Sequence, residues 1–467
     1  MITVSAIVLT AGLVAEATTG RLVSGQPDHV FTEVSIDTRT LAPGALFIAL
    51  RGDRFDGHDF VAPALAAGAS GLLVSSTPAS GAGAAAVIVV PDTLRALQDL
   101  ARFVRRAAGS RVVAITGSAG KTTTKEVTAD LLATRFRVFR NRGNLNNHVG
   151  LPLSLVGLVD RPDVAVVELG MNHEGEIRTL VGIAEPEIRV WTNVGDAHLG
   201  YFGSREAVAR AKAEILEGAT AATLVVSNAD DPLVAAHVAR SLARQVTFGF
   251  SERATVRVAS VEDRGFDGTT ADVDTPRGRL QLRVPLAGRA QLMNVLAATA
   301  IAIELGVPRE AIERSVPSIQ AVARRGAIHV LANGARLIDD SYNASPAAVR
   351  AMLTALAATP AAGRRVAVLG EMRELGESSR ALHDACGRAA ADAGVGALVV
   401  IGGTAADGLV AGAVAAGLPP ARIHRFADSA TAAARIYELV EPGDLVLVKG
   451  SRGTRTDVVV DRLLGVA

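Results

Sequence analysis

Two glycines, a lysine and several threonines stand together between an apolar run, 112–116, and a helix-like stretch. The segment consists of Thr116, Gly117, Ser118, Ala119, Gly120, Lys121, Thr122 and Thr123. In a strand–loop–helix context, its backbone N–H groups and the helix N-terminus would face phosphate oxygens. Lys121 would neutralise β- and γ-phosphates, and the Thr122 hydroxyl would ligate Mg²⁺. Ile115 stands where the usual motif has glycine, so this is a shortened variant; a glycine-rich turn with a chance Lys-Thr pair is the alternative.

Two further apolar runs lead into groups that could bind a metal. Glu168 lies at the end of the run 164–169, and His198 lies past the run 189–193. Open α/β sheets place ligands at the carboxyl ends of their strands. Oxygen ligands suit Mg²⁺, for which imidazole is less usual. We therefore interpret both residues as metal ligands, with a purely structural histidine as the alternative.

Lysine is rare in this sequence. Of the 48 Lys and Arg residues, only four are lysine: Lys121, Lys125, Lys212 and Lys449. A GC-rich genome explains the shortage but not the positions that retain lysine. Lysine can lose its proton and react, whereas arginine stays charged, so each lysine is a functional candidate. Lys212 lies in a helical stretch, 205–217, where a solvated surface lysine is the alternative.

Polar clusters give weaker signals. Four asparagines fall between 141 and 147, in either a plain polar loop or a surface for a polar ligand. Asn294 lies in an Ala-rich helical stretch, and an Arg-Arg pair stands at 324–325. The segment 338–346 places two acids at a strand end before a Pro turn, where they could hold a ribose or an amine.

The length of 467 residues suggests about three domains. Apolar runs alternating with helical stretches predict parallel α/β units, whereas short alternating segments between 246 and 284 predict a small antiparallel patch. A Pro-flanked stretch, 316–323, reads as a linker. The expected strands are 112–116, 164–169, 189–193, 223–227, 366–369, 397–401 and 445–448. The expected domains are 1–92, 93–316 and 317–467.

Charge and cysteine content exclude several classes of protein. Lys+Arg numbers 48 and Asp+Glu 47, so no basic excess supports a nucleic-acid or membrane-surface binder. The apolar stretch 397–420 reads as a strand and a helix rather than as a membrane span. A single cysteine, Cys386, excludes an internal disulfide framework and favours a reducing compartment. We expect a cytoplasmic protein without membrane insertion.

Taken together, these residues resemble the Mur ligases of peptidoglycan synthesis over essentially the whole chain. The resemblance rests on the loop 117–123, the asparagine cluster, Glu168, His198 and Lys212, and on the segments 339–346, 369–377 and 449–452. Near the N-terminus, 34–39, 43–47 and 52–58 are similar to the family's UDP-binding domain. Ser345, Glu371 and Ala119 depart from the common pattern without removing a phosphate or metal group.

The resemblance implies an α/β protein of three domains: an N-terminal UDP-binding domain, a central P-loop domain for ATP and Mg²⁺, and a Rossmann-like C-terminal domain. It implies a monomeric, ATP-dependent amide ligase that joins D-Ala-D-Ala to UDP-N-acetylmuramoyl-tripeptide through an acyl phosphate. The implied catalytic residues are Lys121, Lys212, His198 and Glu168. The implied metal ligands are Thr122, Glu168, His198 and Lys212, the last as a carbamate.

The implied ATP-binding residues are those from Thr116 to Thr123 together with Asn294, Arg325 and Asp340. The implied substrate-binding residues are Ser35, Asp37, Thr38, Arg39, Gly52, Asp56, His58, Asn144, Asn146, Asn147, Tyr342, Asn343 and Lys449. One alternative is the sister ligase that adds the third amino acid, although its Asn-Pro-Arg-type segment is missing from the last domain. Others are a folylpolyglutamate synthetase, a catalytically inactive nucleotide-binding protein and a P-loop motor or switch.

Overall fold

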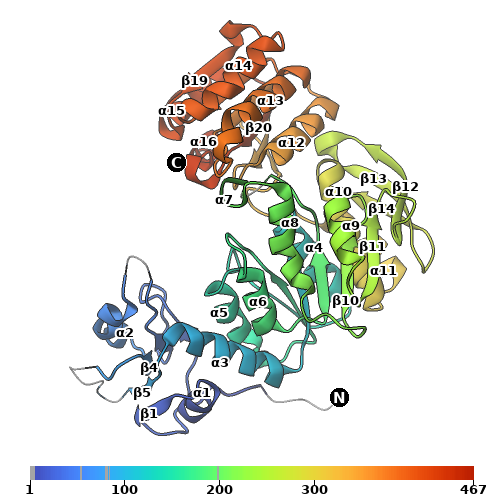
Figure 1. The fold of residues 1–467 in the computed structure, drawn as a ribbon. Coiled ribbons are helices and arrows are strands. Elements are labelled where there is room, and N and C mark those ends of the chain that lie inside the picture. Colours follow the sequence, from blue (N-terminus) through green and yellow to red (C-terminus); the bar gives the residue numbers. More distant parts are fainter. Residues whose placement is uncertain (1–5, 53–54, 79–82, 84, 197–198, 467) are drawn as a thin grey trace. The chain divides into compact units, whose positions relative to one another are not determined.

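The computed structural model describes residues 6–52, 55–78, 83, 85–196 and 199–466, and its strands form three sheets (Figure 1). The first sheet has the order β1-β5-β4-β3-β2, the second β14-β13-β12-β11-β10-β9-β6-β8-β7, and the third β15-β16-β20-β17-β18-β19. The strands of the first sheet are β1 (Arg21–Ser24), β2 (Val34–Ser35), β3 (Leu46–Ile48), β4 (Gly71–Val74) and β5 (Ala86–Val89). Those of the second are β6 (Arg111–Thr116), β7 (Val138–Arg140), β8 (Val164–Glu168), β9 (Ile188–Trp191), β10 (Leu224–Asn228), β11 (Arg244–Gly249), β12 (Val256–Asp263), β13 (Thr269–Asp274) and β14 (Leu280–Val284). Those of the third are β15 (Ala327–Val330), β16 (Arg336–Asp340), β17 (Arg365–Gly370), β18 (Ala397–Ile401), β19 (Ile423–Phe426) and β20 (Leu445–Lys449).

Helices connect most of these strands, as the alternating pattern of the sequence predicts. They are α1 (Ala11–Ala17), α2 (Val61–Ala66), α3 (Thr93–Ala108), α4 (Lys121–Ala133), α5 (Gly150–Val156), α6 (Glu176–Ala184), α7 (Leu199–Phe202), α8 (Arg205–Ala213), α9 (Pro232–Val238), α10 (Gly288–Glu304), α11 (Arg309–Ser315), α12 (Pro346–Ala358), α13 (Ser379–Asp392), α14 (Asp407–Ala415), α15 (Ser429–Leu439) and α16 (Asp457–Leu464). In the part of the chain that the structure describes, no helix has the length and apolar character needed to cross a bilayer.

By its internal contacts the chain divides into two compact units, 1–114 with 136–189, and 115–135 with 190–467. Within the first unit, β3, β4 and β5 are parallel neighbours whose side chains form a buried cluster around Phe47 and Leu72. The mixed α/β class predicted from the sequence is confirmed. The expected boundaries after 92 and after 316 stay predictions.

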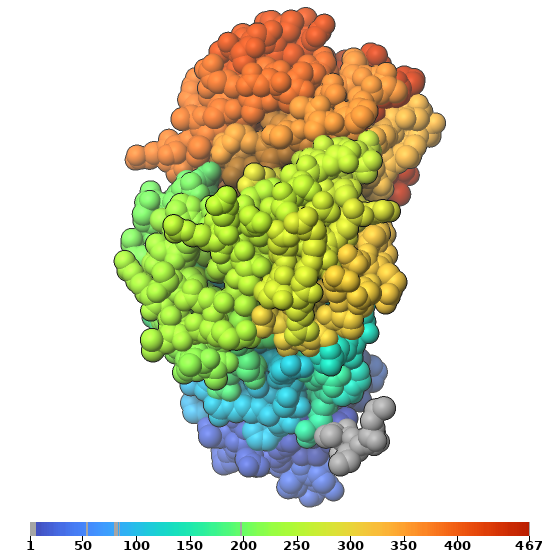
Figure 2. All heavy atoms as spheres, turned by 90° about the vertical axis from the view of Figure 1, so that its right-hand side faces the viewer, coloured from blue at the N-terminus to red at the C-terminus, as the bar shows by residue number. Residues whose placement is uncertain are grey.

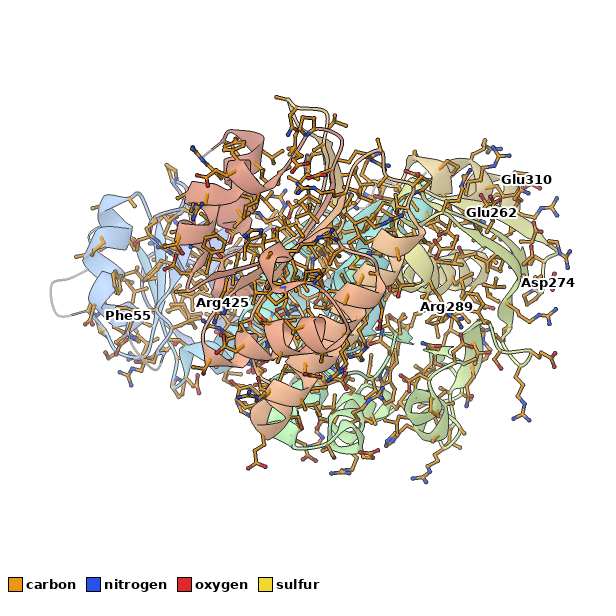
Figure 3. The ribbon with its side chains drawn as sticks, turned by 90° about the horizontal axis from the view of Figure 1, so that it is seen from above. Phe55, Glu262, Asp274, Arg289, Glu310 and Arg425 are labelled. Atoms are coloured by element: carbon orange, nitrogen blue, oxygen red, sulfur yellow. The ribbon has the colours of Figure 1, made fainter. Side chains whose placement is uncertain are left out.

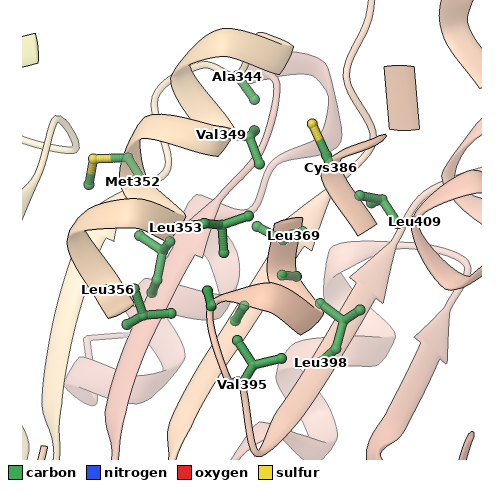
Figure 4. Close-up of a cluster of buried hydrophobic side chains, with 14 of the residues drawn as sticks. Ala344, Val349, Met352, Leu353, Leu356, Leu369, Cys386, Val395, Leu398 and Leu409 are labelled. Carbon is green, nitrogen blue, oxygen red and sulfur yellow. The ribbon is translucent and has the colours of Figure 1, made fainter. Parts of the chain in front are cut away.

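The third sheet is covered on both faces, because its side chains alternate between two buried clusters. Along β17, Val366 and Val368 belong to the cluster under α15 and α16, whereas Ala367 and Leu369 belong to the cluster under α12, α13 and α14 (Figure 4). A strand with period-two side chains and apolar residues on both faces must lie between two helical layers. Strands β16, β20, β17, β18 and β19 are all parallel, as the Rossmann-like prediction requires.

The predicted antiparallel patch is present as β12, β13 and β14. The turn between β12 and β13 packs into a buried cluster of the third sheet. Figure 3 labels Glu262 and Asp274 on this patch, and Figure 2 shows its atoms beside those of the C-terminal part. Phe266, from the turn between β12 and β13, is 2% exposed and belongs to the cluster under α12. Its backbone N–H donates to Thr359 Oγ1 at 2.7 Å. Removing a buried phenylalanine side chain typically costs about 3–5 kcal/mol, so this contact is strong.

Candidate functional site

The glycines of the phosphate loop are required by both conformation and space. Gly120 has φ +83°, and a Cβ atom there would lie 2.1 Å from Asn294 Oδ1. A Cβ atom on Gly117 would lie 1.9 Å from Thr192 Oγ1. Larger residues would therefore strain the backbone and push the loop off the elements behind it. Helix α4 begins at Lys121, directly after this turn.

Residues that follow β9 hold the phosphate loop from behind. The Ser118 N–H donates to the Asn193 carbonyl at 3.0 Å, and the Ala119 N–H donates to Asn193 Oδ1 at 2.9 Å. Thr192 Oγ1 donates to the Ala119 carbonyl at 2.7 Å. The sequence prediction did not include Thr192 or Asn193 among the site residues. The change from an apolar strand to small polar residues after position 191 is the signal that could have found them.

Two side chains of the loop fit an anionic ligand. Lys121 Nζ donates to the Gly117 carbonyl at 2.7 Å, which keeps its charge at the loop. The Ser118 Oγ atom is buried and has no hydrogen-bond partner among the described residues. Buried hydroxyls are normally paired, so an unpaired one within a glycine-rich turn at a helix N-terminus suits a phosphate oxygen.

Asn294 lies against this loop, and its part in ATP binding stays a prediction. It comes from α10 and is 7% exposed. Its Oδ1 accepts from Thr124 Oγ1 at 3.3 Å, and its Nδ2 donates to Gln291 Oε1 at 2.9 Å. The asparagine is thus fixed between α4 and its own helix, and its amide lies directly against Gly120.

The asparagine cluster and Glu168 lie together in the first unit. Glu168 is 3% exposed at the end of β8, and its Oε1 accepts from Asn146 Nδ2 at 2.8 Å. Its N–H donates to Asn141 Oδ1 at 3.1 Å. Asn147 Oδ1 accepts from the Gly150 N–H at 2.8 Å, so this side chain caps α5, while Asn144 is exposed. The structure therefore divides the cluster: Asn146 binds the carboxylate of Glu168, Asn141 binds the Glu168 backbone N–H, and Asn147 binds the first N–H of a helix.

A buried carboxylate and a buried threonine hydroxyl are the oxygen donors that Mg²⁺ prefers. Thr122 is 7% exposed and Glu168 3%. Lys212 lies on α8 and is 1% exposed, so the solvated surface lysine is excluded. His198 falls outside the described residues. Among the described residues, no three His, Cys, Asp or Glu side chains gather into a group that could hold a metal ion.

The predicted UDP-binding residues form two hydrogen-bonded turns in the first unit. Arg39 contacts both carboxylate oxygens of Asp37, with Nη2 to Oδ2 at 2.6 Å, and this pair lowers the pKa of Asp37 to about 2. Ser35 Oγ lies 3.2 Å from the Asp37 N–H that donates to it. Thr38 stands within this turn, half-buried. This geometry fits a plain surface turn as well as it fits a turn that binds UDP.

In the second turn, His58 is held at both ring nitrogens. Nδ1 lies 2.5 Å from Asp56 Oδ1, and Nε2 accepts from the Ser75 N–H at 2.9 Å. The imidazole therefore joins this turn to the end of β4. Gly52 closes the turn by donating its N–H to the Phe55 carbonyl at 2.9 Å.

The candidates of the last domain form one cluster, although the sequence divided them between ATP and substrate. Lys449 is 3% exposed, forms an ion pair with Asp340, and donates to the Asn343 carbonyl at 3.0 Å. Arg325 stacks over the Tyr342 ring with its Cζ 4.0 Å from the centroid. Burial raises the pKa of Asp340 against the opposing effect of Lys449. The structure brings these five residues together at the ends of β16 and β20.

Arg373 is a candidate that the sequence prediction passed over. It is exposed, and its N–H donates to Ser451 Oγ at 3.0 Å. A Cβ atom on Gly453 would lie 2.5 Å from Arg373 Nη1, so the guanidinium lies flat on this glycine. No carboxylate pairs with it among the described residues. A positioned guanidinium of this kind suits an anionic ligand.

The chain contains a P-loop, a buried carboxylate at a strand end, a buried lysine and a Rossmann-like last sheet. These are features of an ATP-dependent enzyme with several domains. Family models match the chain in three places: "Mur ligase family, catalytic domain" at 30–105, "Mur ligase middle domain" at 115–302, and "Mur ligase, glutamate ligase domain" at 324–452. The chain belongs to the Mur ligase family.

Relatives within the family match over nearly the full length. The UDP-N-acetylmuramoyl-tripeptide--D-alanyl-D-alanine ligase of Escherichia coli is 36% identical over 450 residues, which cover 93% of this chain and 94% of the relative. The crystal structure of MurF from Acinetobacter baumannii is 32% identical with a TM-score of 0.88, and the match covers 99% of this chain and 100% of that chain. MurF ligase from Thermotoga maritima in complex with ADP is 29% identical with a TM-score of 0.80, covering 93% and 97%.

Proposed function

We propose that this chain joins D-Ala-D-Ala to UDP-N-acetylmuramoyl-tripeptide with hydrolysis of ATP to ADP and phosphate, in the synthesis of peptidoglycan precursors. The observation that carries the proposal is the phosphate loop, with Lys121 and the unpaired Ser118 hydroxyl, in a chain that matches ligases of this name from end to end. We further propose that it works in the cytoplasm as a monomer.

The first step forms an acyl phosphate on the tripeptide. A carboxylate oxygen attacks the γ-phosphorus of ATP, the bond to the β–γ bridging oxygen breaks, and ADP leaves. Lys121 offsets the negative charge of the two anions that meet, an electrostatic contribution typical of phosphoryl transfer. The rigid backing by Thr192, Asn193 and Asn294 keeps the loop in position during transfer.

The second step forms the amide. The free amine of D-Ala-D-Ala attacks the acyl carbon, and phosphate leaves with one oxygen of the former carboxylate. We assign the dipeptide to the last domain, where Lys449, Asn343 and Tyr342 lie together and the Arg373 guanidinium has no carboxylate partner among the described residues. The nucleotide end of the other substrate is assigned to the turns that contain Ser35, Arg39 and His58.

For Mg²⁺, Thr122 and Glu168 are assigned as ligands of one ion, and His198 with a carbamate on Lys212 as ligands of a second. When bound, the metal would screen the charge of the phosphates. The donor types fit, because a carbamate formed from CO₂ on the buried Lys212 would be an anion with two oxygens, which suits Mg²⁺. The alternative is a plain ammonium that contacts the acyl phosphate.

The identity of the amine separates this proposal from its rivals. Purified protein is incubated with ATP, Mg²⁺ and UDP-N-acetylmuramoyl-tripeptide, and ADP release is measured with D-Ala-D-Ala, with single amino acids and with no amine. We expect release to depend on D-Ala-D-Ala. With the corresponding dipeptide nucleotide, release triggered by diaminopimelate or lysine would indicate the sister ligase. No release under any condition would indicate an inactive nucleotide-binding protein.

A further inference from the structure

Several contacts join the segment 190–316 to the last domain within the second unit, including an ion pair between Asp267 and Arg336. Two of the others differ greatly in character. The first, the hairpin contact, consists of Gly265 and Phe266 packed on Ala355 and Thr359 of the α12 region. The second, the α7 contact, is a hydrogen bond from the Gly200 N–H to the Glu374 carbonyl at 2.7 Å. Figure 1 shows α7 at the edge of the C-terminal elements.

The hairpin contact is buried, and it combines apolar packing of Phe266 with the hydrogen bond to Thr359. Phe266 is buried in the same cluster as Val349 and Leu353, and a Cβ atom on Gly265 would lie 2.2 Å from Thr359 Oγ1. Opening it would expose a phenylalanine to water, whereas opening the α7 contact would exchange one protein hydrogen bond for bonds to water. The α7 contact is therefore the one that can form and break during a catalytic cycle.

The loop that carries Glu374 is fixed on the side of its own domain. The Glu371 N–H donates to the Ile401 carbonyl at 2.8 Å, and the Met372 N–H donates to His383 Nε2 at 2.9 Å. The Arg373 N–H donates to Ser451 Oγ. Three successive N–H groups are thus bound before the chain reaches Glu374.

Glu371, at the start of the same loop, makes further hydrogen bonds within the last domain. Thr454 Oγ1 donates to the Glu371 carbonyl at 2.9 Å, and the Gly403 N–H donates to Glu371 Oε2 at 2.5 Å. Arg425, labelled in Figure 3, donates to the carbonyls of Gly402 and Gly403 at 2.8 and 2.7 Å. The loop therefore moves with the last domain as a rigid part.

Glu374 adopts the left-handed conformation with φ +66°, which is uncommon for a residue with a side chain. Glu374 is also the residue whose carbonyl accepts from the Gly200 N–H. Gly200 itself has no positive φ, yet a Cβ atom on it would lie 3.0 Å from the Glu374 carbonyl oxygen and 3.1 Å from its carbon. Glycine is present at 200 because of the close approach and not because of its own conformation.

On the other side of the contact, α7 leads directly into α8. Ser204 caps α8 by accepting from the Ala207 N–H at 3.2 Å, and α8 carries Lys212. A second, weaker contact supports the same junction, because Arg350 of α12 lies 4.0 Å from Asp196. The α7 contact thus connects the loop of Arg373 with the helix of Lys212.

We propose that Gly200 and Glu374 are positioning residues for the second step of the ligase reaction. Their hydrogen bond holds the Arg373 loop in register with α8 when the amine substrate is bound, while the hairpin contact keeps the last domain attached throughout. The inference rests on the proposed function for the identity of the amine, but the contact itself does not depend on it.

The test compares Gly200→Ala and Gly200→Val with the wild-type enzyme. Gly182→Ala is the matched control, because that glycine lies inside α6 and its Cβ atom would approach nothing closer than 3.9 Å. For Gly200→Ala we expect kcat/KM for D-Ala-D-Ala to fall about twofold to tenfold, which corresponds to about 0.4–1.4 kcal/mol, close to the net value of one hydrogen bond. The valine variant should lose more, and the KM values for ATP and the nucleotide tripeptide should stay within about twofold.

An equal fall in kcat/KM for all three substrates, or an unchanged kcat/KM for D-Ala-D-Ala in Gly200→Val, would overturn the proposal. A second readout is amide hydrogen exchange of the peptide that spans 199–204, which contains the Gly200 N–H of the contact. It should exchange faster in the Gly200→Val enzyme than in the wild type and the control, whereas the N–H groups of 371–373, which are bound within the last domain, should exchange as before. A wild-type enzyme that releases no ADP with the dipeptide would refute the proposed function, and unchanged exchange in the 199–204 peptide would refute the contact.

Discussion

Gly120→Ala is the substitution whose effect on the phosphate loop can be worked out most fully from the structure. The alanine would have to adopt φ +83°, which costs about 1–2 kcal/mol for a residue with a Cβ atom. That Cβ atom would also stand 2.1 Å from Asn294 Oδ1, whereas a normal contact is about 3.5 Å or more. The loop, the asparagine or both must then shift by roughly 1 Å.

Asn294 has little freedom to yield, because Thr124 and Gln291 bind its amide. A displacement of about 1 Å at a reacting group commonly lowers the rate by about 10²-fold. We therefore expect Gly120→Ala to lower kcat/KM for ATP by about 10²-fold or more in a coupled ADP-release assay. Gly182→Ala, the same change at an open helical position, should leave the rate within about twofold.

A double variant separates the clash from the backbone strain. Gly120→Ala with Asn294→Ala removes the clashing amide, so its loss should be smaller than the product of the two single losses. Strictly multiplicative losses would contradict the geometry, and so would a Gly120→Ala enzyme with near-normal turnover.

Four further predictions follow from other parts of the molecule. Lys121→Ala should lower turnover by about 10²-fold or more, because it removes the charge that offsets the γ-phosphate; near-normal steady-state turnover would refute the role. Arg39→Ala should raise KM for the nucleotide tripeptide and leave that for ATP nearly unchanged; an equal rise in both would refute the placement. Lys212→Ala activity should be partly restored by small carboxylic acids, which can occupy the position of the carbamate; rescue by small amines alone would favour the ammonium. Burial raises the pKa of Cys386 from 9.0 to about 11, so its contribution to stability is present below pH 9 and is lost between pH 9 and 11, by about 2–3 kcal/mol. Chemical denaturation of wild type and Cys386→Ala across that range measures this, and parallel pH profiles would contradict it.

The sequence predicts best those features that local pattern controls. The strands β6, β8, β10, β17, β18 and β20 were expected within one or two residues, because each is a short apolar run buried on both sides. The phosphate loop could also be predicted from local pattern, because a strand, a glycine-rich loop and a helix follow one another directly in the sequence. Strands such as β2, with two residues, are too short to produce one.

Features that depend on distant residues could not be predicted. Phe266 looks like an exposed hairpin residue until Thr359, 93 positions later, is brought beside it. Gly453 has no positive φ to explain it, but the guanidinium of Arg373 lies where its Cβ atom would stand. Asn147 matched a ligand-binding residue by type, but its side-chain Oδ1 accepts from the Gly150 N–H at the start of α5, a capping role that asparagine commonly takes. Its part in substrate binding stays a prediction.

Oxygen transfer tests the central claim most directly. The terminal carboxylate of the tripeptide is labelled with ¹⁸O in both positions, and the reaction is run with ATP and D-Ala-D-Ala. If the chain forms an acyl phosphate and then the amide, one ¹⁸O atom appears in inorganic phosphate and the other remains in the new amide carbonyl. Phosphate without ¹⁸O, or ADP formed at the same rate without the dipeptide, would contradict the account.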